Sequence, residues 1–209
     1  MTKFIPAARF NFLTPLFDFF CRFFGLGKRY RKSLLRLIPI KSVNARVLDA
    51  GCGSGTLALE LKEKYQGLRL YGLDADEKIL GIAKRKSKEK NLAIHFRQGL
   101  MQKLPFPDNS FDLVYSSLVF HHLNSKDKQL ALKEIYRVIN KDGILFLADL
   151  GKPKNILTAP FSWFTIILEE GKDNYKGYLP IMLKQANFSE IEEVGRYKFN
   201  ISFLKAVKN

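Results

Sequence analysis

The chain has 209 residues, of which 46% are hydrophobic and 26% charged, a balance typical of a folded globular chain and not of a disordered one. Two cysteines, Cys21 and Cys52, are too few for a disulfide framework, and no Cys/His cluster has metal-ligand spacing, so we predict no metal site. The net charge of +15 indicates an acidic partner, either a nucleic acid or an anionic membrane surface.

The first 45 residues are both basic and rich in phenylalanine. They hold nine Lys and Arg against one acid, Asp18, and eight of the 18 phenylalanines. Thr14-Pro15 indicates a helix start and Gly25 a helix end, with the phenylalanines gathered on one side. Residues 10–24 are too short for a membrane span, and no small-residue cleavage site follows them. We therefore expect a cytoplasmic protein whose helical extension over 1–45 acts as a lid or as a peripheral contact with the inner membrane face.

From residue 46 onward, short apolar segments alternate with helical spacing. Strands are predicted over 46–49, 69–74, 93–98, 111–116 and 143–149, and helices over 56–65, 78–90 and 126–140. A helix over 178–186 and two strands over 189–196 and 198–207 complete the chain. Apolar strands separated by helices indicate a parallel sheet covered on both faces, so we predict one α/β domain over 46–209.

A glycine-rich turn follows the first predicted strand. The strand ends in Asp49, and Gly51, Gly53 and Gly55 lead into a helix that starts at Thr56. The dinucleotide fingerprint needs a glycine where Thr56 stands, and the Lys-Ser/Thr pair of a P-loop is also missing. The turn therefore favours a ligand other than a dinucleotide or a nucleoside triphosphate.

A second acid, Asp74, ends the second predicted strand, 23 residues after Gly51. A carboxylate at this point of a βαβ unit can accept both hydroxyls of a ribose. Asp49, at the end of the first strand, would face a cationic group instead. A ribose acceptor, a cation acceptor and no phosphate site together favour S-adenosylmethionine over NAD or ATP.

Four segments in order carry a family resemblance: VLDAGCGSG (47–55), YGLDAD (71–76), LPFPDNSFDLVYSSLVFHHL (104–123) and EIYRVINKDGILFLAD (134–149). They resemble class I S-adenosylmethionine-dependent methyltransferases of the group that includes the ubiquinone/menaquinone C-methyltransferases. The resemblance implies a Rossmann-like seven-stranded, mostly parallel sheet whose last strand is antiparallel. It also implies S-adenosylmethionine as cofactor and S-adenosylhomocysteine as product.

The resemblance further implies cofactor-binding roles for individual residues. The methionine moiety would lie against Asp49, Ala50, Gly51, Cys52, Gly53 and Gly55, the ribose against Asp74, and the adenine on Ala75. Ser116 and Ser117 would border the methionine moiety and the substrate entrance. The family usually has an acid after the glycine that follows the third strand, but here Leu100 and Met101 follow Gly99. Only the backbone of these two residues would then line the adenine, which predicts a weaker hold on the cofactor or a loss of catalysis.

Two adjacent histidines are the candidate general bases. His121 and His122 follow the fourth predicted strand, at the rim where the acceptor is expected. The alternative is that they only brace the following helix. A base is needed only if the acceptor must lose a proton.

Three hypotheses for the function remain open. In the first, the basic, apolar segment over residues 10–32 docks on an anionic membrane and the enzyme methylates a lipid-like acceptor such as a quinone or a phospholipid. In the second, the chain methylates RNA or another nucleic acid, although it lacks the Asn/Asp-Pro-Pro-aromatic motif and any recognisable RNA-binding module. In the third, it binds S-adenosylmethionine without catalysis. Fold alone does not choose among them.

Overall fold

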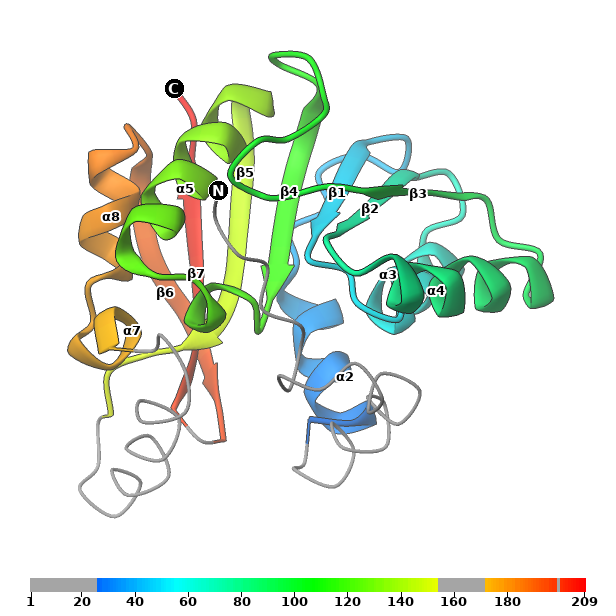
Figure 1. Ribbon diagram of the computed structural model, residues 1–209, viewed down its shortest axis with the longest axis horizontal. Coiled ribbons are helices and arrows are strands. Elements are labelled where there is room, and N and C mark those ends of the chain that lie inside the picture. Colours follow the sequence, from blue (N-terminus) through cyan, green and yellow to red (C-terminus); the bar gives the residue numbers. More distant parts are fainter. Residues whose placement is uncertain (1–25, 154–171, 199) are drawn as a thin grey trace.

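The computed structural model describes residues 26–153, 172–198 and 200–209, and its centre is a seven-stranded sheet (Figure 1). The strand order is β3-β2-β1-β4-β5-β7-β6. The strands are β1 (Arg46–Ala50), β2 (Arg69–Asp74), β3 (Ile94–Gln98), β4 (Phe111–Ser117), β5 (Ile139–Leu150), β6 (Ser189–Tyr197) and β7 (Ile201–Val207). β1 to β5 pair in parallel, whereas β7 runs antiparallel to both β5 and β6. The predicted Rossmann-like sheet with an antiparallel last strand is confirmed.

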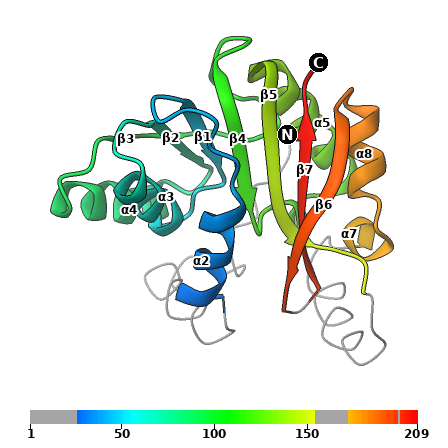
Figure 2. The same cartoon turned by 180° about the vertical axis from the view of Figure 1, so that it is seen from behind.

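Helices cover both faces of the sheet (Figures 1 and 2). They are α2 (Lys28–Leu37), α3 (Thr56–Lys64), α4 (Glu77–Glu89), the 3-10 turn η3 (Phe120–His122), α5 (Ser125–Val138), α7 (Lys172–Lys176) and α8 (Leu179–Gln185). One core layer joins α2 and α3 to the sheet, and the other joins α5 and α8 to the opposite face. Alternation along β1 sends Val47 into the first layer and Leu48 into the second, as expected for a strand buried on both sides.

Three predicted element boundaries are wrong by two or more residues. The helix predicted to run to residue 140 ends at Val138, because Ile139 pairs with Phe111 and begins β5 four residues earlier than predicted. The register between β4 and β5 then shifts, because Phe111 pairs with Ile139 but Leu113 pairs with Ile144. The last strand begins at Ile201 instead of residue 198, after a turn in which Asn200 has φ +62°.

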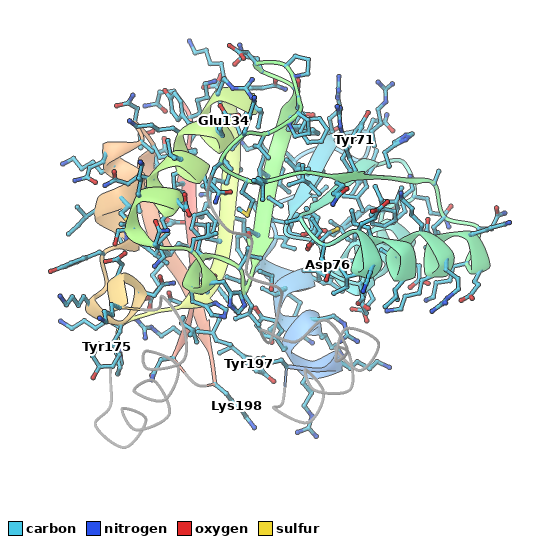
Figure 3. The ribbon with its side chains drawn as sticks, viewed as in Figure 1. Tyr71, Asp76, Glu134, Tyr175, Tyr197 and Lys198 are labelled. Atoms are coloured by element: carbon cyan, nitrogen blue, oxygen red, sulfur yellow. The ribbon has the colours of Figure 1, made fainter. Side chains whose placement is uncertain are left out.

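The basic run after residue 27 forms helix α2, which lies within the predicted helical extension, although limits were predicted only for the helix before Gly25. Tyr30 and Leu34 of α2, and Ile38 directly after it, recur every four positions and pack in the core. The Tyr30 ring lies 5.2 Å from the ring of Tyr197, which Figure 3 shows at the end of β6. The phenylalanine-rich helix predicted before Gly25 lies outside the described residues, so the division of the chain at residue 45 stays a prediction. Among the helices that the structure does describe, none is long and apolar enough to cross a bilayer.

A fork of hydrogen bonds from α5 holds the segment between β3 and β4. The guanidinium of Arg137 donates to the carboxylates of Glu134 (2.8 Å) and Asp108 (2.7 Å) and to the backbone oxygens of Leu104 and Phe106. Glu134, labelled in Figure 3, also accepts from the Leu104 N–H at 2.8 Å. This segment includes the residues predicted to line the adenine, so α5 supports that side of the site.

Candidate active site

The glycine-rich turn leaves β1 at the edge where the parallel strands β1, β2 and β4 end. The N–H groups of Gly51 and Cys52 both donate to the Leu73 oxygen, at 2.7 and 2.9 Å, which ties the turn to β2. Gly51 and Gly55 have φ of +83° and +72°, where a side chain is strained. A Cβ on Gly51 would also overlap the Val119 side chain. The turn therefore requires glycine for both its shape and its close packing.

Asp74 ends β2 and organises the same turn. Its carboxylate accepts from the Gly53 N–H at 2.8 Å and from the Asp76 N–H at 3.0 Å. Asp76 in turn caps α4 by accepting from the Lys78 N–H at 2.8 Å (Figure 3). Burial raises the pKa of Asp74 above its ordinary value, against the opposing effect of the two N–H donors. Each carboxylate oxygen can still accept further hydrogen bonds, as a ribose site requires.

Asp49 is a buried acid without a counter-charge. It is 2% exposed, and its Oδ2 accepts from the Tyr115 hydroxyl at 3.0 Å. Within the described parts of the chain, no cationic side chain pairs with it. Burial, and to a smaller extent the charge of Asp74, raise its pKa to about 8, while the Tyr115 hydrogen bond lowers it. A cationic ligand would stabilise the ionised form of this buried carboxyl group.

Cys52 shows no sign of nucleophilic chemistry. Its side chain is buried, and burial together with the charges of Asp49 and Asp74 raises the pKa of the thiol well above its ordinary value. The thiol therefore stays protonated, which makes it a poor nucleophile. Among the described residues, no group of His, Cys, Asp and Glu could hold a metal ion.

The two serines predicted to border the cofactor use their hydroxyls within the protein. Ser116 Oγ donates to the Ala50 oxygen at 2.6 Å and ties the ends of β4 and β1 together. Ser117 Oγ lies 2.9 Å from the Tyr30 hydroxyl and ties β4 to α2. Both serines therefore lie at the predicted edge, where they position neighbouring elements.

The residues predicted to meet the adenine lie at the ends of β2 and β3. The Gln98 side chain donates to the Ala75 oxygen at 3.1 Å, across the gap between these strands. Met101 is buried, whereas Leu100 is 38% exposed and forms an isolated bridge with Lys103. Leu100 thus presents an apolar side chain to solvent directly after Gly99, whose N–H donates to the Asp74 backbone oxygen at 3.0 Å.

After β4 the chain turns back over the glycine loop. Leu118 has φ +58°, a strained value for a residue with a side chain, and Val119 then packs against Gly51. Asp149, near the end of β5, accepts from the N–H groups of Val119 (2.9 Å) and Phe120 (2.7 Å). The turn that carries both candidate histidines is therefore held directly against the predicted cofactor loop.

The two histidines differ in their partners. His121 Nδ1 lies 2.8 Å from Asp149 Oδ1, and both side chains are buried. Burial works to raise the pKa of Asp149, but His121 and the N–H donors outweigh it, so that pKa falls below its ordinary value. His122 lies with its ring centroid 4.0 Å from that of His121, and burial and this neighbour lower its pKa to about 3. Asp149 thus has the charge to support a protonated His121, whereas His122 stays neutral.

Sequence reasoning missed three residues of this arrangement. Asp149 follows the same pattern as Asp49 and Asp74, an acid at the end of an apolar strand, so its position was a usable signal. Tyr115 reaches Asp49 because the two residues are register partners in neighbouring strands. Asn174, on α7, donates from Nδ2 to Asp149 Oδ1 at 3.1 Å. No local pattern marks Tyr115 or Asn174.

Comparisons with known proteins agree with this geometry. Residues 48–147 match the model of a methyltransferase domain. The chain is 34% identical over 146 residues to the demethylmenaquinone methyltransferase of Thermus thermophilus, a match that covers 69% of this chain and 65% of that enzyme, slightly less than two thirds. It is 33% identical over 195 residues to the ubiquinone/menaquinone biosynthesis C-methyltransferase UbiE of Rickettsia bellii, covering 80% of this chain and 77% of that enzyme.

Solved structures support the fold. A methyltransferase of Aquifex aeolicus, described as dependent on S-adenosylmethionine, superposes with a TM-score of 0.67 at 21% identity, over 86% of this chain and 89% of that one. Human N-acetylserotonin methyltransferase in complex with S-adenosylmethionine superposes with a TM-score of 0.70 at 22% identity, over 86% of this chain and 51% of that one.

Proposed function

We propose that this chain methylates a small apolar acceptor of the quinone type, because it belongs to the ubiquinone/menaquinone C-methyltransferase family of S-adenosylmethionine-dependent methyltransferases. The chain is a methyltransferase, and its cofactor is S-adenosylmethionine. The observation that carries the proposed acceptor is the 33% identity, over four fifths of the chain, to an enzyme named for ubiquinone and menaquinone biosynthesis.

The residues at the sheet edge fit the cofactor. The turn over residues 51–55 packs so closely that a Cβ on Gly51 or Gly55 would overlap a neighbouring side chain, and Asp49 is a buried carboxyl group with no cationic partner among the described residues. Asp49 would neutralise the positive charge of the methionine moiety, and Asp74 would accept the ribose hydroxyls. When bound, S-adenosylmethionine supplies a methyl group already activated by the sulfonium. The protein's part is then to align the acceptor and to exclude water.

His121 is the group of this site best suited to take a proton from the acceptor. Its turn packs on the cofactor loop through Val119, and Asp149 stabilises the charge that a protonated imidazole would carry. Carbon methylation of an aromatic ring, and methylation of a hydroxyl, both release a proton that a base can accept. His122, with its low pKa, is the weaker candidate.

The acceptor is tested directly by assay. Purified protein is incubated with S-adenosylmethionine and with chemically reduced demethylmenaquinone, and the methylated quinone is detected by mass spectrometry. Total RNA and phosphatidylethanolamine vesicles serve as alternative acceptors in parallel reactions. Methyl transfer to the quinone, and not to the others, is the expected result. Transfer only to RNA or only to phospholipid would refute the quinone proposal.

We also propose that α2 docks on an anionic membrane, which is where an apolar quinone would be found. Four of its cations are exposed, and the helix contains no acid. The exposed cations are Lys28, Arg29, Lys32 and Arg36. Tyr30, from the buried side of α2, contacts Ser117 at the end of β4, so the basic face lies close to the predicted acceptor entrance. Each cation near an anionic surface contributes about 1 kcal/mol.

Vesicle flotation with a matched control tests this contact. Changing the four α2 cations to Gln should abolish flotation with vesicles that contain phosphatidylglycerol. The control changes four exposed cations of α4, Lys78, Lys84, Arg85 and Lys88, to Gln, which removes the same charge from another surface. Equal losses in both variants would mean that only net charge matters. A loss of RNA binding confined to the α2 variant, with flotation unchanged, would favour a nucleic-acid partner.

A further inference from the structure

We propose that Asp149 is a positioning residue that, together with Asn174, fixes the tautomer of His121 so that Nε2 receives the proton released by the acceptor. This inference rests on the proposed function, since it assigns the proton acceptor of the same site. A bracing role could be filled by either histidine, whereas this role requires the imidazole of His121 and its Nε2 atom.

The hydrogen bonds of Asp149 dictate the tautomer. An ionised carboxylate only accepts hydrogen bonds, and Asp149 already accepts from the N–H groups of Val119, Phe120 and Leu150. His121 Nδ1, at 2.8 Å from Oδ1, must therefore carry a hydrogen. In the neutral imidazole the lone pair is then on Nε2, the nitrogen that can act as a base.

Asn174 makes the orientation of Asp149 unambiguous. It is fully buried on α7, and its Nδ2 donates to the same Oδ1 that meets His121, at 3.1 Å. Its own Oδ1 has no hydrogen-bond partner among the described residues. A flipped Asn174 amide would turn its oxygen toward the Asp149 carboxylate, and the two acceptors would repel each other, so Asp149 holds the amide in its donating orientation. The hydrogen bond from Asn174 in turn fixes the rotation of the carboxylate.

Asp149 is the described acid that contacts His121 and favours its protonated state. His122 lies beside His121 and would repel a second charge. Directly before Asn174 on α7, Asp173 accepts from Ser125 Oγ at 2.6 Å and lies 3.4 Å from the fully buried Lys128 Nζ, so its charge is balanced on α5. Asp173 is thus an acid of the same helix that does not contact the imidazole.

Methyl transfer conserves atoms and electrons. The acceptor's nucleophilic atom forms a bond to the methyl carbon, the S–CH3 bond breaks, and its electron pair remains on sulfur. The proton that the acceptor loses goes to His121 Nε2, and the imidazolium that forms is stabilised by Asp149. Solvent removes the proton before the next turnover. No oxidant or further reactant is required.

Asp149→Asn separates positioning from bracing. The remaining oxygen can still accept from Val119 and Phe120, so the turn keeps its brace. The new NH2 group takes the place of Oδ1, faces His121 and forces Nδ1 to accept, which moves the hydrogen to Nε2. The Asn174 amide then turns its unpartnered oxygen toward this NH2 group, and the Leu150 N–H loses its acceptor. With general-base assistance lost, kcat with S-adenosylmethionine and reduced demethylmenaquinone should fall about a hundredfold to ten-thousandfold, with little change in KM.

Two variants serve as references. His121→Gln can still donate to Asp149 but has no base, so it should lose activity to a similar extent while keeping its thermal stability. Asp173→Asn removes a nearby negative charge without touching the imidazole, so its kcat should stay near that of the wild type. A fall in kcat as large as that of Asp149→Asn would assign the effect to net charge and overturn the role of Asp149.

A second measurement needs no acceptor. Long-range 15N–1H spectra report the tautomer of each of the three histidines, and His121→Gln assigns the signal. The expected result is Nδ1–H for His121 in the wild type and Nε2–H in Asp149→Asn. An Nε2–H wild type, or an unchanged tautomer in the variant, overturns the inference. If reduced demethylmenaquinone is not methylated but the tautomer switches as expected, the acceptor proposal fails and the positioning role stands.

Discussion

Cofactor binding should be coupled to the ionisation of Asp49. Burial raises the pKa of this carboxyl to about 8, so it is mostly protonated in the ligand-free protein at pH 7. A cationic ligand requires the carboxylate, and binding must then expel the proton. The ionisation of Asp49 should therefore add to the affinity for S-adenosylmethionine as pH rises toward and through 8, in the wild type but not in Asp49→Asn.

The size of this effect follows from the pKa. The ionisation of Asp49 alone, with a pKa of about 8, makes the apparent Kd roughly tenfold weaker at pH 7 than at pH 9, or about 1.4 kcal/mol. The same pKa predicts the release of roughly 0.9 proton per cofactor bound at pH 7 and roughly 0.1 at pH 9. Below pH 7, each further unit weakens binding about tenfold.

Isothermal titration calorimetry measures both quantities, in buffers with different ionisation enthalpies. The cofactor's own α-amino group titrates near the same pH, at about 7.7–8.0. Asp49→Asn is the matched control, because the ligand's titration is common to both proteins and cancels in their difference. The variant should bind more weakly at pH 9 and lose the tenfold dependence. Identical pH profiles for the two proteins would refute Asp49 as the counter-charge.

Three further predictions concern the frame of the site. Gly51→Ala introduces a strained φ and an overlap with Val119, so it should lower the free energy of unfolding in urea by about 1–3 kcal/mol and abolish cofactor binding. A stable variant that binds the cofactor normally would contradict the packing of this turn. Asp74→Asn should weaken S-adenosylmethionine about 10- to 100-fold by calorimetry, through the ribose contacts; an unchanged Kd would remove Asp74 from the site. Arg137→Lys cannot reproduce the fork and should lower unfolding free energy by about 1–2 kcal/mol, since the side chain is partly exposed; full stability would show that the fork is dispensable.

The sheet could be predicted because the residues within each strand mark where that strand begins and ends. β1, β2 and β4 have apolar centres and carry an acid or a serine at or next to their last residue, so their limits were predicted to within one residue. The limits of α2 were missed because half of its residues are charged, although Tyr30 and Leu34, with Ile38 directly after the helix, have helical spacing. α7 is five residues long and polar, and it forms only where its neighbours hold it.

The candidate site was predictable where one strand carries all of the information. Asp49, Asp74 and the glycines of the turn were identified from their place at strand ends. The contacts of Tyr115 and Asn174 were not, because they depend on the register between β1 and β4 and on where α7 packs. Register and packing are properties of the folded sheet, and no run of neighbouring residues encodes them.

The seam between β1 and β4 has a consequence for how enzymes of this kind diversify. The glycine-rich turn follows β1, and the turn that carries His121 and His122 follows β4. These two strands pair in register, and both turns belong to the matched region 48–147. α2 and α7, which contact the ends of β4 and β5, come from outside that region. New acceptor preferences can therefore evolve by exchange of these peripheral helices, while the part of the fold that holds the cofactor is inherited unchanged.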